Sequence, residues 1–179
     1  MKSLGIILVL LAALFIPVQQ CAADPEPGQT LPEYSFPVPD NQADREYLKL
    51  GDASEFTFTD LPTPYLLVEI IGVYCAQCRT QLPGFNKLFK RLQRTDLSER
   101  IKMLSIAAGA TPAEAAYLRK KDYPFPVVRD EDYGFHKQID EPLTPFTMVV
   151  TREGEVLYAH LGIINDIDGF LQDIQRLTK

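Results

Sequence analysis

The chain has 179 residues, and its 18 lysines and arginines against 24 aspartates and glutamates give a formal net charge of −6. This acidic balance argues against a nucleic-acid partner and against binding to anionic membrane surfaces. The length is that of one domain with a sizeable hydrophobic core.

The first 23 residues have the pattern of a secretory signal peptide. Lys2 supplies a positive start, an apolar run covers residues 4–16, and small residues end at Ala23, where we expect cleavage. This predicts an exported protein of the periplasm or another extracytoplasmic space. The alternative is a lipid anchor on Cys21, although a glutamine precedes it where a lipoprotein signal has a small residue.

Residues 24–179 are then the expected mature domain. No further apolar run approaches the roughly 18 residues that a membrane span needs, so we predict no transmembrane segment in the mature chain. Its beginning, residues 24–65, is rich in proline, which predicts extended, irregular or hairpin structure. Residues 54–59 alternate apolar and polar side chains, as in a half-buried strand.

The next segments predict a buried strand that leads directly into a helix. Residues 66–71 are apolar except for Glu69, which favours a central strand covered on both faces. Apolar residues then recur at three- and four-residue spacings to Leu92, which predicts an amphipathic helix from about Cys75. Pro83 lies inside this helix and should kink it.

The remaining chain alternates strand and helix patterns. We predict strands at 101–107 and 125–128, helices at 111–121 and 132–139, a hairpin of 146–150 with 155–159, and a last helix from 165. This order indicates an α/β fold with a central mixed β-sheet flanked by helices.

The cysteine pattern is the strongest functional signal. Without Cys21, only Cys75 and Cys78 remain, and a disulfide between them would close too short a loop to add much stability. Export supplies an oxidising compartment. A helix N-terminus stabilises a thiolate, so we expect Cys75 to be the exposed nucleophile and Cys78 the buried resolving thiol.

Five parts of the chain together resemble exported TlpA/ResA-like proteins of the thioredoxin superfamily. They are the CxxC segment 74–79, Pro83 five residues after the second cysteine, and the segments 125–130, 143–147 and 152–156. The resemblance covers nearly the whole mature chain. It implies a thioredoxin-like fold with an N-terminal β extension and a helix–strand insertion, and an enzyme of dithiol/disulfide exchange.

The resemblance also implies roles for individual residues. Glu69 matches the buried acid of thioredoxins, and burial should raise its pKa so that it can take the proton of the resolving thiol. Thr144 and Pro145 match the family's cis-proline loop, where a substrate strand binds the exposed backbone. Tyr74, which replaces the usual tryptophan, is expected at the rim of the substrate site.

The partners implied are protein thiols and disulfides, and a membrane thiol electron donor that keeps a reductase reduced. The resemblance implies no cofactor beyond the redox-active disulfide. The metal alternative, a zinc site, lacks ligands, because the two histidines are far away in the sequence. The family's maturation of cytochrome c is less directly implied, because Gln81 stands where that branch often has a glutamate.

Three other functions stay open. One is a disulfide-forming oxidase on the same fold, since the Ala-Gln pair between the cysteines does not fix the redox direction. Another is a Sco-like copper-delivery protein, a non-enzyme that would use the two thiolates for Cu(I). The third is a peroxiredoxin. Gly72 argues against it, because those enzymes have a threonine at this position, three residues before the attacking cysteine.

Overall fold

The structure, a computed structural model, describes residues 24–179, so the predicted signal peptide and Cys21 lie outside the described residues. Its centre is a five-stranded sheet in the order β5-β4-β3-β6-β7. Strands β3, β4 and β5 are parallel, whereas β6 is antiparallel to both β3 and β7. The strands are β3 (Tyr65–Gly72), β4 (Ile101–Ala108), β5 (Val127–Asp130), β6 (Phe146–Thr151) and β7 (Val156–Leu161).

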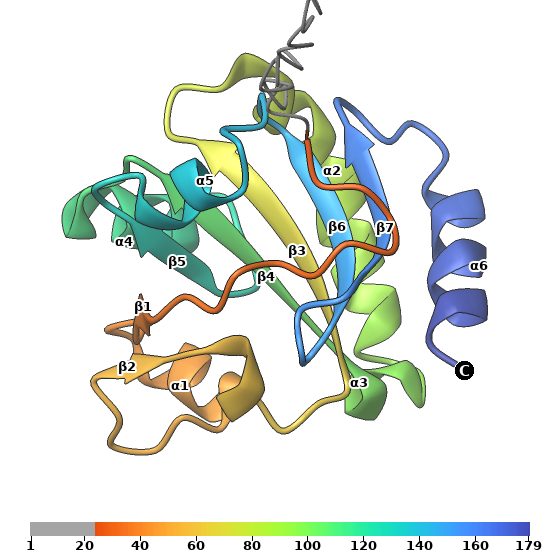
Figure 1. The fold of residues 1–179 in the computed structure, drawn as a ribbon, viewed down its shortest axis with the longest axis horizontal. Helices are drawn as coiled ribbons and strands as arrows, with labels where there is room; N and C mark the ends of the chain where they lie inside the picture. Colours follow the sequence, from red (N-terminus) through yellow and green to blue (C-terminus); the bar gives the residue numbers. More distant parts are fainter. Residues whose placement is uncertain (1–23) are drawn as a thin grey trace, which may run out of the picture.

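Helices and the N-terminal extension cover the two faces of this sheet (Figure 1). One face packs against α2 (Ala76–Leu92), α4 (Pro112–Lys121) and α6 (Ile167–Leu177), with the short α3 (Leu97–Arg100) before β4. The other face packs against α5 and the extension. These elements are α5 (Gly134–Gln138), β1 (Phe36–Pro37), α1 (Gln42–Leu48), β2 (Glu55–Phe56) and the 3₁₀ helix η1 (Phe58–Asp60). The mixed sheet between helices is the predicted fold class.

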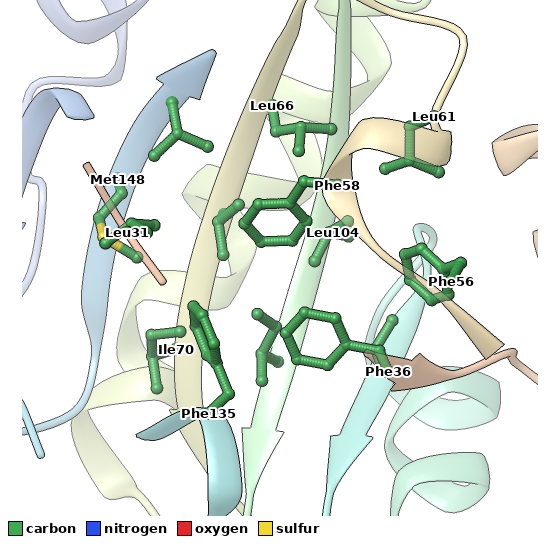
Figure 2. Packing of buried hydrophobic residues seen from close by; sticks show 14 of the residues in the cluster. Leu31, Phe36, Phe56, Phe58, Leu61, Leu66, Ile70, Leu104, Phe135 and Met148 are labelled. Carbon is green, nitrogen blue, oxygen red and sulfur yellow. The ribbon is translucent and has the colours of Figure 1, made fainter. Parts of the chain in front are cut away.

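The two faces of the sheet contribute to two separate hydrophobic cores because side chains alternate along each strand. In β3, Leu66 and Ile70 face the extension, whereas Leu67 and Ile71 face α2. Figure 2 shows the first core, in which Phe36, Phe58 and Phe135 come together over the sheet. Aromatic rings from the extension thereby complete the core of the domain.

The extension is more structured than its prolines predict. The predicted strand 54–59 is only the two-residue β2, followed by η1. Helix α1 is not predicted at all, although Asn41 caps its first turn by accepting from the backbone N–H of Asp44. The seven-residue α1 is too short to show a helical period. Arg119 of α4 holds it, because its Nε donates to both carboxylate oxygens of the buried Asp44 and its guanidinium forms an ion pair with the same carboxylate.

The insertion predicted from the resemblance consists of α4 and β5. The Thr111 side chain accepts from the backbone N–H of Glu114, whose carboxylate accepts from the backbone N–H of Thr111, so a capping box begins α4. Strand β5 starts two residues later than predicted, at Val127, where the pairing with β4 begins. Within residues 24–179, no helix has the length and apolar character needed to cross a bilayer.

Candidate active site

The two cysteines lie at the junction of β3 and α2. Cys75 is the N-cap residue of α2, and its sulfur accepts from the backbone N–H of Cys78 at 3.0 Å. The two cysteines form a disulfide with Cα atoms 5.3 Å apart. Cys75 is partly exposed, whereas Cys78 is 2% exposed. The free N–H groups and dipole of α2 favour negative charge on Cys75, which is therefore the sulfur placed to act as a thiolate nucleophile.

The loop before β6 brings a second backbone segment to Cys75. The peptide bond between Thr144 and Pro145 is cis, as the resemblance predicts. The carbonyl oxygen of Thr144 lies 3.5 Å from the sulfur of Cys75. The backbone of Thr144 therefore borders the sulfur of Cys75.

Tyr74 is directed by the insertion helix. Its side chain is 83% exposed, and its hydroxyl donates to Glu114 of α4 at 3.0 Å. Glu114 also accepts from the backbone N–H of Thr111, and these bonds lower the pKa of its carboxyl. The carboxylate is therefore ionised at neutral pH and accepts a charge-assisted hydrogen bond from Tyr74.

A groove of about 380 Å³ opens beside Cys75. Its apolar side chains are unusually exposed for large hydrophobic residues: Leu143 is 74% exposed and Tyr133 is 45% exposed. Acidic side chains stand at its edges, from Glu114 and Glu141. The groove thus offers apolar contacts and negative charge next to the reactive sulfur.

Glu69 lies in the middle of β3, on the side of the sheet that α2 covers. It is 1% exposed, and burial raises its pKa to about 7, against the opposing effect of two hydrogen bonds. Gln81 donates to its Oε1 at 2.8 Å and Ser105 donates to its Oε2 at 3.0 Å. A carboxyl group with this pKa can gain or lose a proton near neutral pH.

The structure thus gathers the residues that the sequence indicated, with Tyr74, Thr144 and Pro145 around Cys75, and Glu69 in the core below. Glu114, which bonds to Tyr74, and the two partners of Glu69 are not among the site residues that the sequence predicts. The sequence marks Gln81 only as a departure from the family pattern. Ser105 carried a usable signal, because it is an uncharged polar residue within the apolar strand pattern of 101–107.

Among residues 24–179, no group of three or more histidine, cysteine, aspartate or glutamate side chains is arranged to hold a metal ion. His136, which lies beside the groove, has its Nε2 2.9 Å from the carbonyl oxygen of Pro142.

Comparison with known proteins places this geometry in a family. Residues 28–159 match the AhpC/TSA family, a stretch that includes both cysteines, Glu69 and the cis-proline loop. No curated protein sequence is similar enough to the chain to count as a match.

Solved structures share the fold at low sequence identity. A Chlorobium tepidum protein assigned provisionally as the thiol:disulfide interchange protein DsbE is 16% identical with a TM-score of 0.66, over 86% of this chain and 99% of that one. StoA from Bacillus subtilis is 11% identical, with a TM-score of 0.57 over 86% and 100%. A secreted Mycobacterium tuberculosis disulfide oxidoreductase homologous to Escherichia coli DsbE is 12% identical, with a TM-score of 0.58 over 80% and 95%. These likenesses confirm the thioredoxin-like fold.

Proposed function

The chain belongs to the AhpC/TSA family, and on that premise we propose that it is an exported thiol–disulfide oxidoreductase that reduces disulfides in partner proteins. The observation that carries the proposal is the position of Cys75. Its sulfur is bonded to Cys78, lies at the N-terminus of α2 and is 3.5 Å from the Thr144 carbonyl oxygen beside the cis-proline. This is a reversible disulfide in reach of a partner's backbone.

The reaction moves two electrons from the protein dithiol to the partner. The Cys75 thiolate attacks one sulfur of the partner disulfide, which breaks and leaves a thiolate on the partner. Glu69 takes the proton of the Cys78 thiol, and the Cys78 thiolate attacks the sulfur of Cys75. The Cys75–Cys78 disulfide forms, and the second partner sulfur leaves as a thiolate. Glu69 then returns its proton to water.

The groove beside Cys75 binds the partner segment. Thr144 and Pro145 present backbone for hydrogen bonds with an extended chain, and Tyr74 forms the aromatic rim. The exposed apolar side chains and the acidic edge of the groove favour a segment with apolar residues and positive charge near its cysteine. We therefore expect KM, more than kcat, to rise when Leu143 or Tyr74 is shortened to alanine.

Cysteine variants test the exchange reaction. Cys78→Ser keeps the nucleophile but removes the resolving thiol, so it should accumulate a mixed disulfide with a cysteine-containing partner peptide. Cys75→Ser should form no such adduct because its remaining thiol is buried. Mass spectrometry after incubation with the oxidised peptide gives the readout. Equal adduct yields from the two variants would show that the roles of the cysteines are misassigned.

The reduction potential decides the redox direction. The protein of residues 24–179 is equilibrated in defined dithiothreitol or glutathione buffers, and its free thiols are then trapped. The fraction oxidised at each ratio gives the reduction potential of the Cys75–Cys78 disulfide. We expect a value near or below about −250 mV, close to thioredoxin, which a reductase requires. A value near about −120 mV would make the protein a disulfide-forming oxidase instead.

The setting we propose is a periplasmic or similar extracytoplasmic compartment. Support comes from the signal-peptide pattern of residues 1–23 and from a structural relative described as secreted. A reductase there needs a membrane thiol donor to return it to the dithiol state. Apocytochrome c is a candidate partner through the TlpA/ResA-like resemblance, and the acidic edge of the groove supports partners with positive charge near the cysteine.

A further inference from the structure

A closed polar cluster surrounds Glu69 within an otherwise apolar core. Its three side chains come from three elements: Glu69 from β3, Gln81 from α2 and Ser105 from β4. Each is at most 2% exposed. Since water has little access to replace a lost partner, the hydrogen bonds of this cluster are what opposes the effect of burial on the charge state of Glu69.

Gln81 can face Glu69 in one orientation only. Its Oε1 accepts from the backbone N–H of Ile164 at 2.7 Å. Turning the amide over would place its NH₂ group against that N–H and leave both donors buried without an acceptor. The NH₂ group therefore stays on the side of Glu69, 2.8 Å from Oε1, and can only donate.

Ser105 has no such restriction. Its hydroxyl donates to Oε2 of the ionised Glu69 at 3.0 Å, but a hydroxyl can rotate and accept as well. When Oε2 carries a proton, the same pair of oxygens stays hydrogen-bonded with the roles reversed. A proton on Oε1 would instead have to point at the amide donors of Gln81.

The other buried groups around the carboxyl are neutral, and the nearby cation is exposed. Thr147 is the register partner of Glu69 on β6, and its buried hydroxyl has no hydrogen-bond partner. Burial, and then the charge of Glu69, raise the pKa of Tyr123, so this phenol stays protonated at neutral pH. Cys78 does not titrate while it is in the disulfide. Arg79 is exposed to solvent.

We propose that Gln81 is a positioning residue that holds Glu69 through a one-way donor bond and favours its ionised form, while Ser105 bonds to either form and directs the proton to Oε2. This deepens the proposed function, on which it rests, because it assigns how the general base is kept ready. Gln81, the position that departs from the TlpA/ResA-like pattern, thus acts on Glu69 through a hydrogen bond. It does not act on the thiols through a charge, as a glutamate at this position would.

The direct test is the titration of Glu69 in the oxidised protein, followed by the ¹³C NMR signal of its labelled carboxyl carbon. Glu69→Gln removes that signal and so assigns it. Gln81→Met keeps a similar length but cannot donate, so the acid dissociation constant of Glu69 should fall about tenfold. Ser105→Ala removes a partner of both forms and should change the constant less than about threefold.

Gln175→Met, at an exposed position of α6, is the matched control and should leave the constant unchanged. The proposal is overturned if Gln81→Met leaves the constant unchanged, or if Ser105→Ala lowers it as much. The unmodified protein gives a second test should a variant fail to fold. The backbone amide proton of Ile164 should stay protected from hydrogen exchange with solvent at every pH. A loss of this protection that follows the titration of Glu69 would show that the side-chain amide of Gln81 turns over.

The titration needs no partner and no exchange reaction. A protein that fails to reduce disulfides but shows the expected titration would refute the proposed function and leave the cluster assignment intact. In an active protein, Gln81→Met should also shift the pH profile of the thiol–disulfide exchange rate to higher pH. A purely structural role of Gln81 would not produce this shift.

Discussion

Cys75 and Cys78 are three residues apart but differ in their surroundings. Cys75 caps α2 and borders the groove, while Cys78 lies one turn further on and points into the core shared with Phe85 and Ile71. This asymmetry is the basis for the proposal that Cys75 attacks and Cys78 resolves. It follows from the geometry of a helix, whose first residue is at an end and whose next turn must pack.

Glu69 is the residue at which a requirement of folding conflicts with the proposed role as general base. A buried carboxyl whose pKa is raised from 4.5 to about 7 binds its proton more tightly in the folded than in the unfolded chain. Below about pH 4.5 both states are protonated, so Glu69 costs no stability. As pH rises from about 4.5 through 7, only the unfolded chain has released this proton, and the folded protein loses about 3 kcal/mol of stability from this group.

Glu69→Gln should remove that loss. The free energy of unfolding of the oxidised proteins is measured in urea at pH 5 and at pH 8. Its decrease from pH 5 to pH 8 should be smaller in the variant than in the original protein by roughly 2–3 kcal/mol. Glu33→Gln, at an exposed position of the extension, is the control and should keep the original difference. If Glu69→Gln also keeps it, the buried carboxyl does not titrate in this range.

At the level of elements, the site is the meeting point of three connections. The β3–α2 junction provides the cysteines, the loop before β6 provides Thr144, and the insertion helix α4 provides Glu114. The turn after β4 adds Gly109, which lies beneath the ring of Tyr133 at the groove. The insertion therefore shapes the active site as well as extending the sheet.

Gly109 tests how tightly this turn is packed. Its φ is +69°, and a Cβ added there would lie 2.1 Å from the Tyr133 ring. Gly51 has a similar φ of +54°, but a Cβ there would meet nothing within 4 Å. Gly51→Ala should therefore cost about 1 kcal/mol for the left-handed backbone, and Gly109→Ala about 2–4 kcal/mol because of the added contact.

Urea unfolding of the two alanine variants measures this difference. When Gly109→Ala is made in a protein that already carries Tyr133→Ala, the contact with the ring is gone. Gly109→Ala should then lower the free energy of unfolding only as much as Gly51→Ala does in the original protein. A cost for Gly109→Ala no greater than for Gly51→Ala would mean that Tyr133 moves away freely and does not shape the groove.

For the whole molecule, the sheet is sealed on one face by a segment that precedes it in the chain. Phe36 of β1 is 1% exposed, and its ring lies within 5.1–5.8 Å of the rings of Phe56, Phe58 and Phe135 (Figure 2). Tyr34 adds a hydrogen bond to Asp130, whose carboxylate also accepts from the first turn of α5. We therefore expect the extension to unfold together with the sheet.

Phe36→Ala should lower the free energy of unfolding by about 3–5 kcal/mol and leave a single transition with an unchanged denaturant slope. Phe36→Leu keeps most of the volume and should cost less, about 1–2 kcal/mol. Circular dichroism and tyrosine fluorescence follow the transition, since the chain contains no tryptophan. Two separate transitions in Phe36→Ala would mean that the extension folds on its own.

The sequence by itself determined the elements whose pattern is local and long. Strand 66–71, the helix after Cys75, the capped helix from Thr111 and the final hairpin lie where their periodicity, caps and turn residues predict. The CxxC pair at a strand–helix junction also indicated the chemistry, because helix N-termini and paired thiols act over a few residues.

Only the tertiary structure decided what depends on contacts between distant segments. Helix α1 is stable through Asp44 and Arg119, which are 75 residues apart, and Tyr74 is directed by Glu114, 40 residues away. The partners of Glu69 come from α2 and β4, so neither can be identified from the sequence near Glu69. Hydrogen-bond partners and burial are properties of packing, and no local pattern fixes which side chains the folded chain brings together.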